Sequence, residues 1–298
     1  MKHFFLACFF GLIAASAQAD LKVFATVPEW GALVKEIGGD KVKVYVATNA
    51  FQDPHRIEAK PSLLAQARQA NLLVAAGADL EIGWLPLVLR DSGNSAIQVG
   101  RPGYFEAASF VNRLEVPTTL DRAHGDVHAA GNPHTHLDPR NVLKVGAALT
   151  ARMAELDAPN AAAYLAGYQA FSGKWQAAMV RWQNEAAPLK GVPVLVHHAS
   201  FVYLLNWLGM KEVGTLEPKP GIEPTSGHLT ALLTRQQSVP ARMVLRAAYQ
   251  QEGPSQWMAG KTGMPAVLLP YTVGGTPEAK DLFGLFDDTV QRLLKGQQ

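Results

Sequence analysis

Short runs of apolar, largely β-branched residues recur along the first half of the chain and alternate with amphipathic helical patterns. Such runs predict strands, and the segments between them predict helices. The predicted strands are residues 23–26, 42–46, 72–76 and 96–99. The predicted helices are residues 32–37, 61–70 and 80–90. Because strands and helices alternate, we expect parallel strands joined by crossover helices.

The second half of the chain repeats this arrangement. Its predicted strands are residues 192–196, 212–215, 243–247 and 266–269. Its predicted helices are residues 225–236, 254–262 and 281–294. The pattern therefore predicts an α/β protein of two lobes, each with a four-stranded, mainly parallel sheet flanked by helices.

A long helical pattern separates the two halves. From residue 159 to about residue 187, large apolar side chains recur every three or four residues, which is the helical period. They are Tyr164, Tyr168, Phe171, Trp175, Met179 and Trp182. At 1.5 Å per residue this helix would be about 44 Å long, enough to run the height of both lobes. We interpret the aromatic stripe as core, and we expect little movement between the lobes because a helical connector hinges less freely than extended strands.

The N-terminus has the pattern of a secretory signal peptide. Lys2 precedes an almost continuous apolar run over residues 4–17, and Ala17-Gln18-Ala19 is a small-residue cleavage motif. The run is shorter than the ~20 residues that a membrane span needs, so we favour cleavage after Ala19 over an uncleaved anchor. The chain then divides into a signal peptide at 1–19, a first lobe at 20–158, a linking helix at 159–188 and a second lobe at 189–298. We expect a periplasmic protein.

Composition narrows the chemistry that remains. The chain of 298 residues is 48% hydrophobic and 17% charged, with a formal net charge of +2. These values exclude wholesale disorder, and without a long basic run they argue against nucleic-acid binding. The one cysteine, Cys8, lies within the signal peptide, too early for a convincing lipid attachment site. Disulfide scaffolds and cysteine-based zinc or iron–sulfur sites are therefore excluded, and metal chemistry would depend on His, Asp and Glu.

Two groups of histidines stand where parallel sheets bind ligands. His55 follows the second predicted strand, and His197-His198 closes the first predicted strand of the second lobe. Ligands of open parallel sheets bind beyond the carboxyl ends of the strands. Imidazole is a common ligand of zinc and other first-row metals. A metal site between the lobes is therefore the hypothesis, and a solvated or core histidine is the alternative at each single position.

Three histidine motifs, which follow one another along the mature chain, carry a resemblance to a known family. They are Asp53-Pro54-His55 with Pro61-Ser62, the run Asn132-Pro133-His134-Thr135-His136-Leu137-Asp138-Pro139, and His198 with Phe201 and Tyr203. Together they resemble the zinc- and manganese-type (ZnuA/TroA-like) substrate-binding proteins of ABC transporters. The resemblance implies two four-stranded α/β lobes, a long bridging helix and a metal held between the lobes.

The resemblance also implies a ligand set, in which His55, His134 and His198 bind the metal. Three histidines favour Zn²⁺ over Mn²⁺, which prefers more oxygen donors. The chain departs from the family pattern at two places. The segment 269–275 after the last predicted strand has no acid where the family usually supplies a carboxylate, and His136 replaces a bulky apolar or aromatic residue. The candidates for a fourth ligand are His136, a water molecule or a remote acid.

A segment with weak periodicity, residues 104–133, includes His124 and His128. It resembles a short form of the histidine-rich loop of some zinc-binding relatives, which implies an auxiliary role in collecting metal and passing it to the cleft. The alternative is that both histidines stay solvated on a surface loop.

The resemblance implies a periplasmic protein that captures a divalent metal, Zn²⁺ as cargo, and delivers it to a membrane permease powered by an ATPase. We expect a monomer, and a periplasmic metallochaperone is a further candidate partner. The alternatives are capture of Mn²⁺ or another divalent ion, and a zinc-dependent hydrolase. His134-Thr135-His136-Leu137-Asp138 resembles the start of a binuclear zinc hydrolase motif, but Pro139 stands where those enzymes need another histidine. Since G-x-S-x-G and a P-loop are also absent from the sequence, we expect no enzyme.

Overall fold

Two four-stranded sheets, in which every paired strand runs parallel to its neighbour, form the frame of the molecule. The computed structural model describes residues 20–118 and 128–298. The strand orders are β2-β1-β3-β4 and β6-β5-β7-β8, so both lobes have the same topology. The strands are β1 (Leu21–Ala25), β2 (Val42–Val46), β3 (Leu72–Ala75), β4 (Tyr104–Glu106), β5 (Pro193–Val196), β6 (Lys211–Thr215), β7 (Met243–Ala247) and β8 (Ala266–Leu269). The predicted fold class is confirmed.

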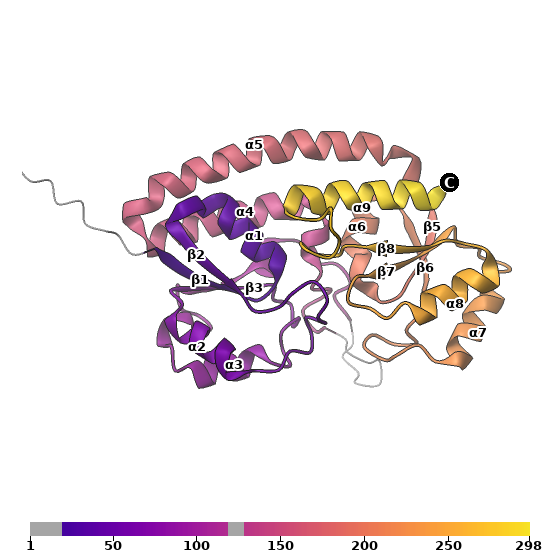
Figure 1. Ribbon diagram of the computed structural model, residues 1–298, viewed down its shortest axis with the longest axis horizontal. Helices are drawn as coiled ribbons and strands as arrows, with labels where there is room; N and C mark the ends of the chain where they lie inside the picture. Colours follow the sequence, from indigo (N-terminus) through magenta and orange to yellow (C-terminus); the bar gives the residue numbers. More distant parts are fainter. Residues whose placement is uncertain (1–19, 119–127) are drawn as a thin grey trace, which may run out of the picture.

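Helices cover both faces of each sheet (Figure 1). They are α1 (Pro28–Gly38), α2 (Pro61–Gln69), α3 (Leu85–Ser92), α4 (Pro139–Leu156), α5 (Ala161–Glu185), α6 (Val202–Leu208), α7 (Ser226–Arg235), α8 (Gly253–Thr262) and α9 (Leu282–Gln297). Alternate side chains of the strands pack on opposite helical layers: Val23 of β1 faces the α1 side, whereas Phe24 faces α2 and α3. One apolar cluster continues from the first sheet through α1, α4 and α5 to α9 and the second sheet.

The long helix α5 bridges the two lobes, as predicted, and runs along the upper edge of the molecule in Figure 1. Its aromatic stripe is buried: Trp175 and Trp182 lie edge to face, 5.0 Å apart, and both contact Phe286 of α9. The indole nitrogen of Trp175 also donates to the carbonyl of Pro139 at 2.9 Å, at the start of α4. Because α4 belongs to the first half of the chain and α9 to the second, these contacts join α5 to both lobes.

One predicted strand is wrong. Residues 96–99 do not pair with a strand, because Asn94 caps a short 3₁₀ turn, Ser95–Ile97, and Ile97 packs into the cluster beneath α2 and α3. The fourth strand of the sheet is instead β4, which pairs with β3. A β-branched residue such as Ile97 can occupy a strand or a turn, and here its packing against α2 and α3 favours the turn.

The helices differ from the predicted ones at several places, and α6 was not predicted. The predicted helix at 80–90 starts only at Leu85, because Gly77, Ala78 and Asp79 all have positive φ and form a tight turn before it. Helix α4 was not predicted at all. Asp138 caps its first turn by accepting a hydrogen bond from the backbone of Arg140, and Pro139 occupies its first position.

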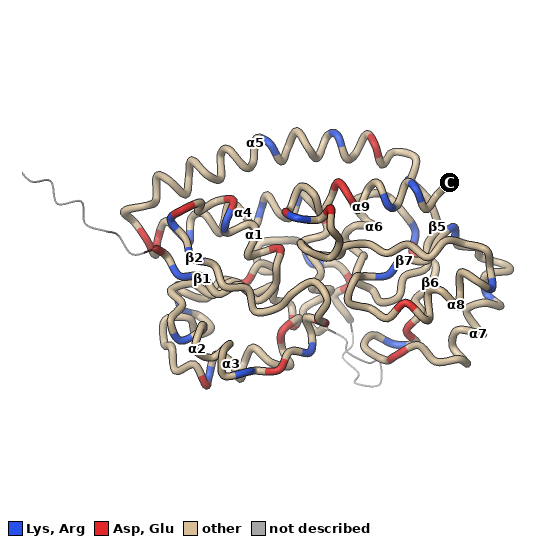
Figure 2. The backbone as a smooth tube through the Cα atoms, viewed as in Figure 1, with Lys and Arg blue, Asp and Glu red and all other residues tan. Residues whose placement is uncertain are grey.

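Basic and acidic side chains are interspersed along both lobes (Figure 2). Within residues 20–118 and 128–298, no helix combines the length and the apolar character needed to cross a membrane.

Candidate metal centre

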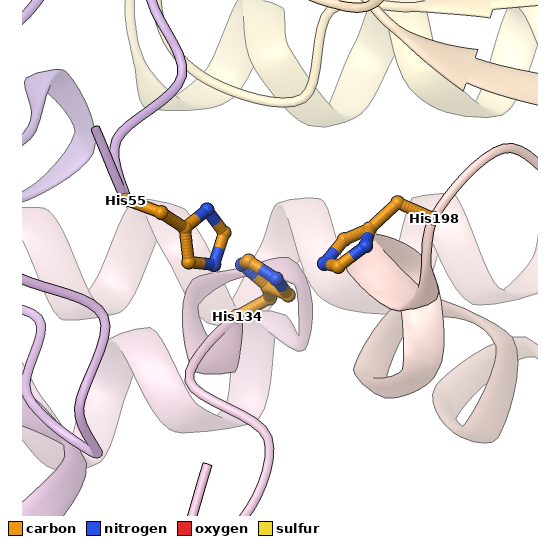
Figure 3. Close-up of side chains that lie close together, drawn as sticks. All are labelled: His55, His134 and His198. Atoms are coloured by element: carbon orange, nitrogen blue, oxygen red, sulfur yellow. The ribbon is translucent and has the colours of Figure 1, made fainter. Parts of the chain in front are cut away.

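Three histidines from distant parts of the chain converge at one point (Figure 3). His55 lies in the loop after β2, His134 immediately before the 3₁₀ turn Thr135–Leu137 that leads into α4, and His198 just after β5. One ring nitrogen of each lies within 4.8 Å of the other two. The first and last of these residues follow strands of different lobes, so the site forms where the carboxyl ends of the two sheets meet.

The three rings form a nearly equilateral triangle. Their centroids are 5.4 Å apart for His55 and His134, 5.6 Å for His55 and His198, and 5.6 Å for His134 and His198. The Nε2 atoms of His55 and His134 are buried and have no hydrogen-bond partner in the structure. Burial of unpaired polar atoms is costly, and a cation at the centre of the triangle would satisfy them. The donor set therefore fits a single divalent metal ion.

The outer nitrogen of each ring is held by another side chain. Nδ1 of His55 lies 2.7 Å from Asp53, and Nδ1 of His198 lies 2.7 Å from Glu217. An ionised carboxylate can only accept, so both Nδ1 atoms carry the proton and Nε2 presents its lone pair inward. Nδ1 of His134 lies 2.9 Å from the hydroxyl of Tyr271. Partners of this kind orient metal-binding imidazoles, and carboxylates also raise their basicity.

The loop that carries His55 is held from two sides. Asp53 also accepts a hydrogen bond from the backbone N–H of His55 at 3.0 Å, which closes a tight turn. From beneath, the indole of Trp84 donates to the carbonyl of Pro54 at 2.9 Å. Because Trp84 is fully buried under the first sheet, its hydrogen bond fixes the position of the loop that carries His55.

Burial and hydrogen bonds determine the charge states around the site. Burial lowers the pKa of His134 well below its usual value, and the neighbouring histidines lower it further, so this imidazole is neutral at neutral pH. Burial raises the pKa of Asp53, but the hydrogen bond from His55 and its charge outweigh burial and lower the pKa overall. Burial raises the pKa of Tyr271 well above its usual value, so its side chain remains a neutral phenol.

His136, a candidate for the fourth ligand, lies outside this triangle. Its Nε2 lies 2.8 Å from the backbone carbonyl of Tyr271, and its Nδ1 lies 3.2 Å from a carboxylate oxygen of Glu29. Both ring nitrogens therefore face these two groups and not the centre of the triangle. His136 thus belongs to a buried polar network next to the site and is not one of the converging ligands.

The second auxiliary candidate, His128, lies against the triangle. Its ring stacks on that of His55 with centroids 5.3 Å apart. It also lines a cavity of about 190 Å³ that reaches the cluster; the other lining residues are Glu115, Gly131, Asn132, His134, His198, Ala199 and Pro220. His124 lies outside the described residues.

Two residues of the site were missed from the sequence. Glu217 comes two positions after β6, at the same edge of the sheet as His198, and this topological position is a signal that could have found it. Tyr271 stands in the segment 269–275, which contains no acid. Its φ of +65° is unusual for a residue other than glycine and often accompanies a functional role, but a backbone angle is visible only in the structure.

A family model described as ZnuA, zinc-uptake complex component A periplasmic, matches residues 23–296. The chain belongs to this family. Members of the ZnuA family are metal-binding, substrate-binding components of ABC transporters that work with a membrane permease and an ATPase, and they are not enzymes. The hydrolase alternative is therefore unsupported. The family model is described as periplasmic, and curated relatives of this chain are named lipoproteins.

Curated relatives are similar over most of this ZnuA-family chain. The manganese ABC transporter substrate-binding lipoprotein PsaA of Streptococcus pneumoniae is 25% identical over 273 residues, 90% of this chain and 84% of the relative. The manganese-binding lipoprotein MntA of Halalkalibacterium halodurans is 23% identical over 242 residues, 77% of this chain and 75% of the relative.

Solved structures share the fold. A crystal structure of ZnuA has a TM-score of 0.77 at 23% identity and covers 94% of this chain and 100% of its own. A manganese-bound periplasmic metal-binding protein from Candidatus Liberibacter asiaticus has a TM-score of 0.74 at 15% identity, with coverage of 93% and 99%. The same fold therefore occurs in a structure named as ZnuA and in a structure named as manganese-bound.

Proposed function

We propose that this protein captures Zn²⁺ between its lobes, with His55, His134 and His198 as ligands, and delivers it to a membrane permease. The observation that carries the proposal is the convergence of three imidazoles whose outer nitrogens are held by other side chains. Zinc accepts such a nitrogen set at 2.0–2.1 Å in tetrahedral sites. Zn²⁺ here is cargo, because a transport protein must release what it binds.

The donor set favours zinc over manganese, although relatives carry manganese in their names. Affinity for nitrogen donors rises from Mn²⁺ toward Zn²⁺, and Mn²⁺ prefers carboxylate and water oxygens. The carboxylates of Asp53 and Glu217 are directed at outer imidazole nitrogens and not at the centre of the triangle. Mn²⁺ or another divalent ion of the same family is the second candidate cargo.

A water molecule or His128 would complete the fourth coordination position. Stacking on His55 and a place in the cavity wall favour His128 as an auxiliary group that meets the ion before it reaches the three ligands. His124, four residues earlier in the chain, is proposed for the same auxiliary role.

The leader at 1–19 would be removed after Ala19, which leaves a cysteine-free, monomeric periplasmic protein. Residues 1–19 lie outside the described residues, so this boundary stays a prediction from the sequence. The lobe boundaries at 158 and 188 and a metallochaperone as a second partner also remain predictions.

Alanine substitution tests the ligand set. Loss of a side chain that merely orients a ligand costs about 10–100-fold in metal affinity, so His55→Ala, His134→Ala and His198→Ala should each weaken zinc binding by more than about 100-fold. Competition against a chromophoric zinc chelator measures the affinity of each variant. Elemental analysis of protein purified without added metal measures which metal is bound, and how much. His228→Ala is the matched control, because His228 hydrogen-bonds the backbone of Thr215 away from the triangle.

The same measurement with Mn²⁺ decides the cargo. We expect the parent protein to bind Zn²⁺ more tightly than Mn²⁺ by several orders of magnitude. Equal losses in all four histidine variants would refute the site, and tighter binding of Mn²⁺ than of Zn²⁺ would refute the choice of metal while leaving the site intact.

A further inference from the structure

The three metal-facing histidines differ in where their outer partners come from. Asp53 is two residues from His55, and Glu217 is on the same lobe as His198, 19 residues away. Tyr271 is 137 residues from His134 and follows β8, the last strand of the second sheet. His134 instead leads into α4, which packs against α1 of the first lobe. Of the three outer hydrogen bonds, therefore, this one alone joins the two lobes.

The loop after β8 is fastened to the first lobe at two further points. The backbone carbonyl of Tyr271 accepts a hydrogen bond from Nε2 of His136 at 2.8 Å. The hydroxyl of Thr272 donates to Glu29 of α1 at 2.5 Å. Both carboxyl oxygens of Glu29 are used, because the other faces His136. These contacts dock the loop of the second lobe on the first lobe, through a buried network that surrounds, but does not enter, the histidine triangle.

The conformation of this loop is tightly constrained. Tyr271 has a left-handed backbone with φ of +65°, and a Cβ at Gly275 would lie 1.9 Å from the carbonyl oxygen of Pro270. The phenol ring is 4% exposed and lies edge to face with His134 and His136, and Tyr249 packs on its other side at 5.3 Å. Such strain persists where surrounding contacts hold it, and here those contacts place one hydroxyl on Nδ1 of His134.

We propose that Tyr271 is the positioning residue through which the second lobe sets the orientation of His134, so that zinc affinity depends on how the lobes are docked. The proposal rests on the proposed zinc site. When the lobes are docked, the phenol oxygen of Tyr271 is placed to accept a hydrogen bond from Nδ1–H of His134, which leaves the lone pair of Nε2 for the metal. When docking loosens, His134 loses its hydrogen bond to Tyr271, whereas His55 and His198 keep their bonds to Asp53 and Glu217. The ligand then turns away, and the ion is released.

The tautomer of His134 in the metal-free protein tests the positioning step. The hydrogen bond at one ring nitrogen decides which nitrogen carries the proton. In long-range ¹H–¹⁵N spectra of histidine-labelled protein, the parent should show His134 protonated at Nδ1, and Tyr271→Phe should shift it toward the other tautomer. Signals of His55 and His198 should stay unchanged. This readout needs no metal, so it separates failure of this proposal from failure of the zinc site.

Zinc binding tests the consequence. Tyr271→Phe should raise the zinc Kd by about 10-fold, and no more than about 100-fold, chiefly through faster dissociation. Tyr249→Phe is the matched control, since it removes a hydroxyl from the adjacent ring that lies beside Ser200, and its Kd should stay within about twofold of the parent. Tyr271→Phe with parental affinity and an unchanged His134 tautomer would overturn the proposal.

A double-mutant cycle tests the dependence on lobe docking. Thr272→Val breaks the bond to Glu29 on the same loop without touching His134. If docking acts through Tyr271, Thr272→Val weakens zinc binding a few-fold in the parent and adds nothing in the Tyr271→Phe background. Additive effects would show instead that Tyr271 is a local support, and the docking part of the proposal would be refuted. Thermal unfolding of each metal-free variant identifies one that fails to fold, and Thr272→Ala then replaces Thr272→Val. Thr272→Ser keeps the hydroxyl and should retain parental binding.

Discussion

Burial makes His134 chemically different from other histidines in the chain. Its side chain is 1% exposed, and its pKa is lowered first by that burial and then by His55 and His198. A neutral imidazole offers a lone pair to a metal without first releasing a proton. The lowered pKa of His134 thus keeps this ligand ready to bind metal at neutral pH. The same lowered pKa makes the stability of the metal-free protein depend on pH.

Acidification should destabilise the metal-free protein through His134. The unfolded chain has an ordinary histidine pKa near 6.5 and the folded chain a lower one, so the unfolded state takes up the proton first as the pH falls. Stability should be intact above pH 6.5 and decline below it, by up to about 1.4 kcal/mol per pH unit until the folded pKa is reached. Urea unfolding at pH 7.5 and 5.5, with a chelator present, measures the decline.

His134→Gln is the control for this titration, because an amide does not ionise. It should lose less stability than the parent between the two pH values. An equal loss in both proteins would assign the pH dependence to other groups.

At the scale of elements, patterns with a strong period were predictable and short runs were not. The aromatic stripe of α5 has one buried face in the structure, as its spacing predicted. Helix α4 carries a comparable stripe at Val142, Val145, Leu149 and Met153, so the sequence contained a signal that was overlooked beside the histidine motif. The strand β4 is only three residues long, and its place depends on pairing with β3, which no local pattern encodes.

The aromatic seam between α5 and α9 should carry much of the stability of the molecule. Trp182 is fully buried, stacks on Phe286 at 5.0 Å and donates to Asp287 at 2.5 Å. Trp182→Ala should lower the free energy of unfolding by about 3–5 kcal/mol, because it leaves a large cavity. Chemical denaturation measures the change. Leu165→Ala on the same helix is the control, since that side chain is 52% exposed and should cost less than about 0.5 kcal/mol.

Zinc affinity of Trp182→Ala should match that of the parent below the unfolding transition. A change confined to zinc affinity, with stability unaltered, would contradict the structural role assigned to the seam.

At the scale of the whole molecule, one apolar cluster spans both lobes and the helix that joins them. Domain closure around a ligand usually depends on a few loop residues that absorb large backbone changes. Here the lobes are connected by a 25-residue helix whose buried face contacts both α4 and α9. Changes on metal binding should therefore be local, in the loops that carry the ligands and their partners.

Small-angle X-ray scattering tests this expectation. The metal-free and zinc-loaded proteins should have the same radius of gyration within experimental precision. His198→Ala with zinc added controls for effects of the ion outside the site. A clear contraction of the parent on loading, absent in the variant, would show that the lobes close as rigid bodies.

The sequence by itself determined the two α/β lobes and the bridging helix, because strand and helix periods are local properties. The set of His55, His134 and His198 was implied by the resemblance of their motifs to a known family. Only the tertiary structure decided what surrounds those histidines. His136 faces Glu29 and a carbonyl, His128 stacks on His55, and Tyr271 holds His134 from the other lobe. These contacts join residues as far as 137 positions apart. They depend on how the lobes dock, and docking is a property of the packed core rather than of any single segment.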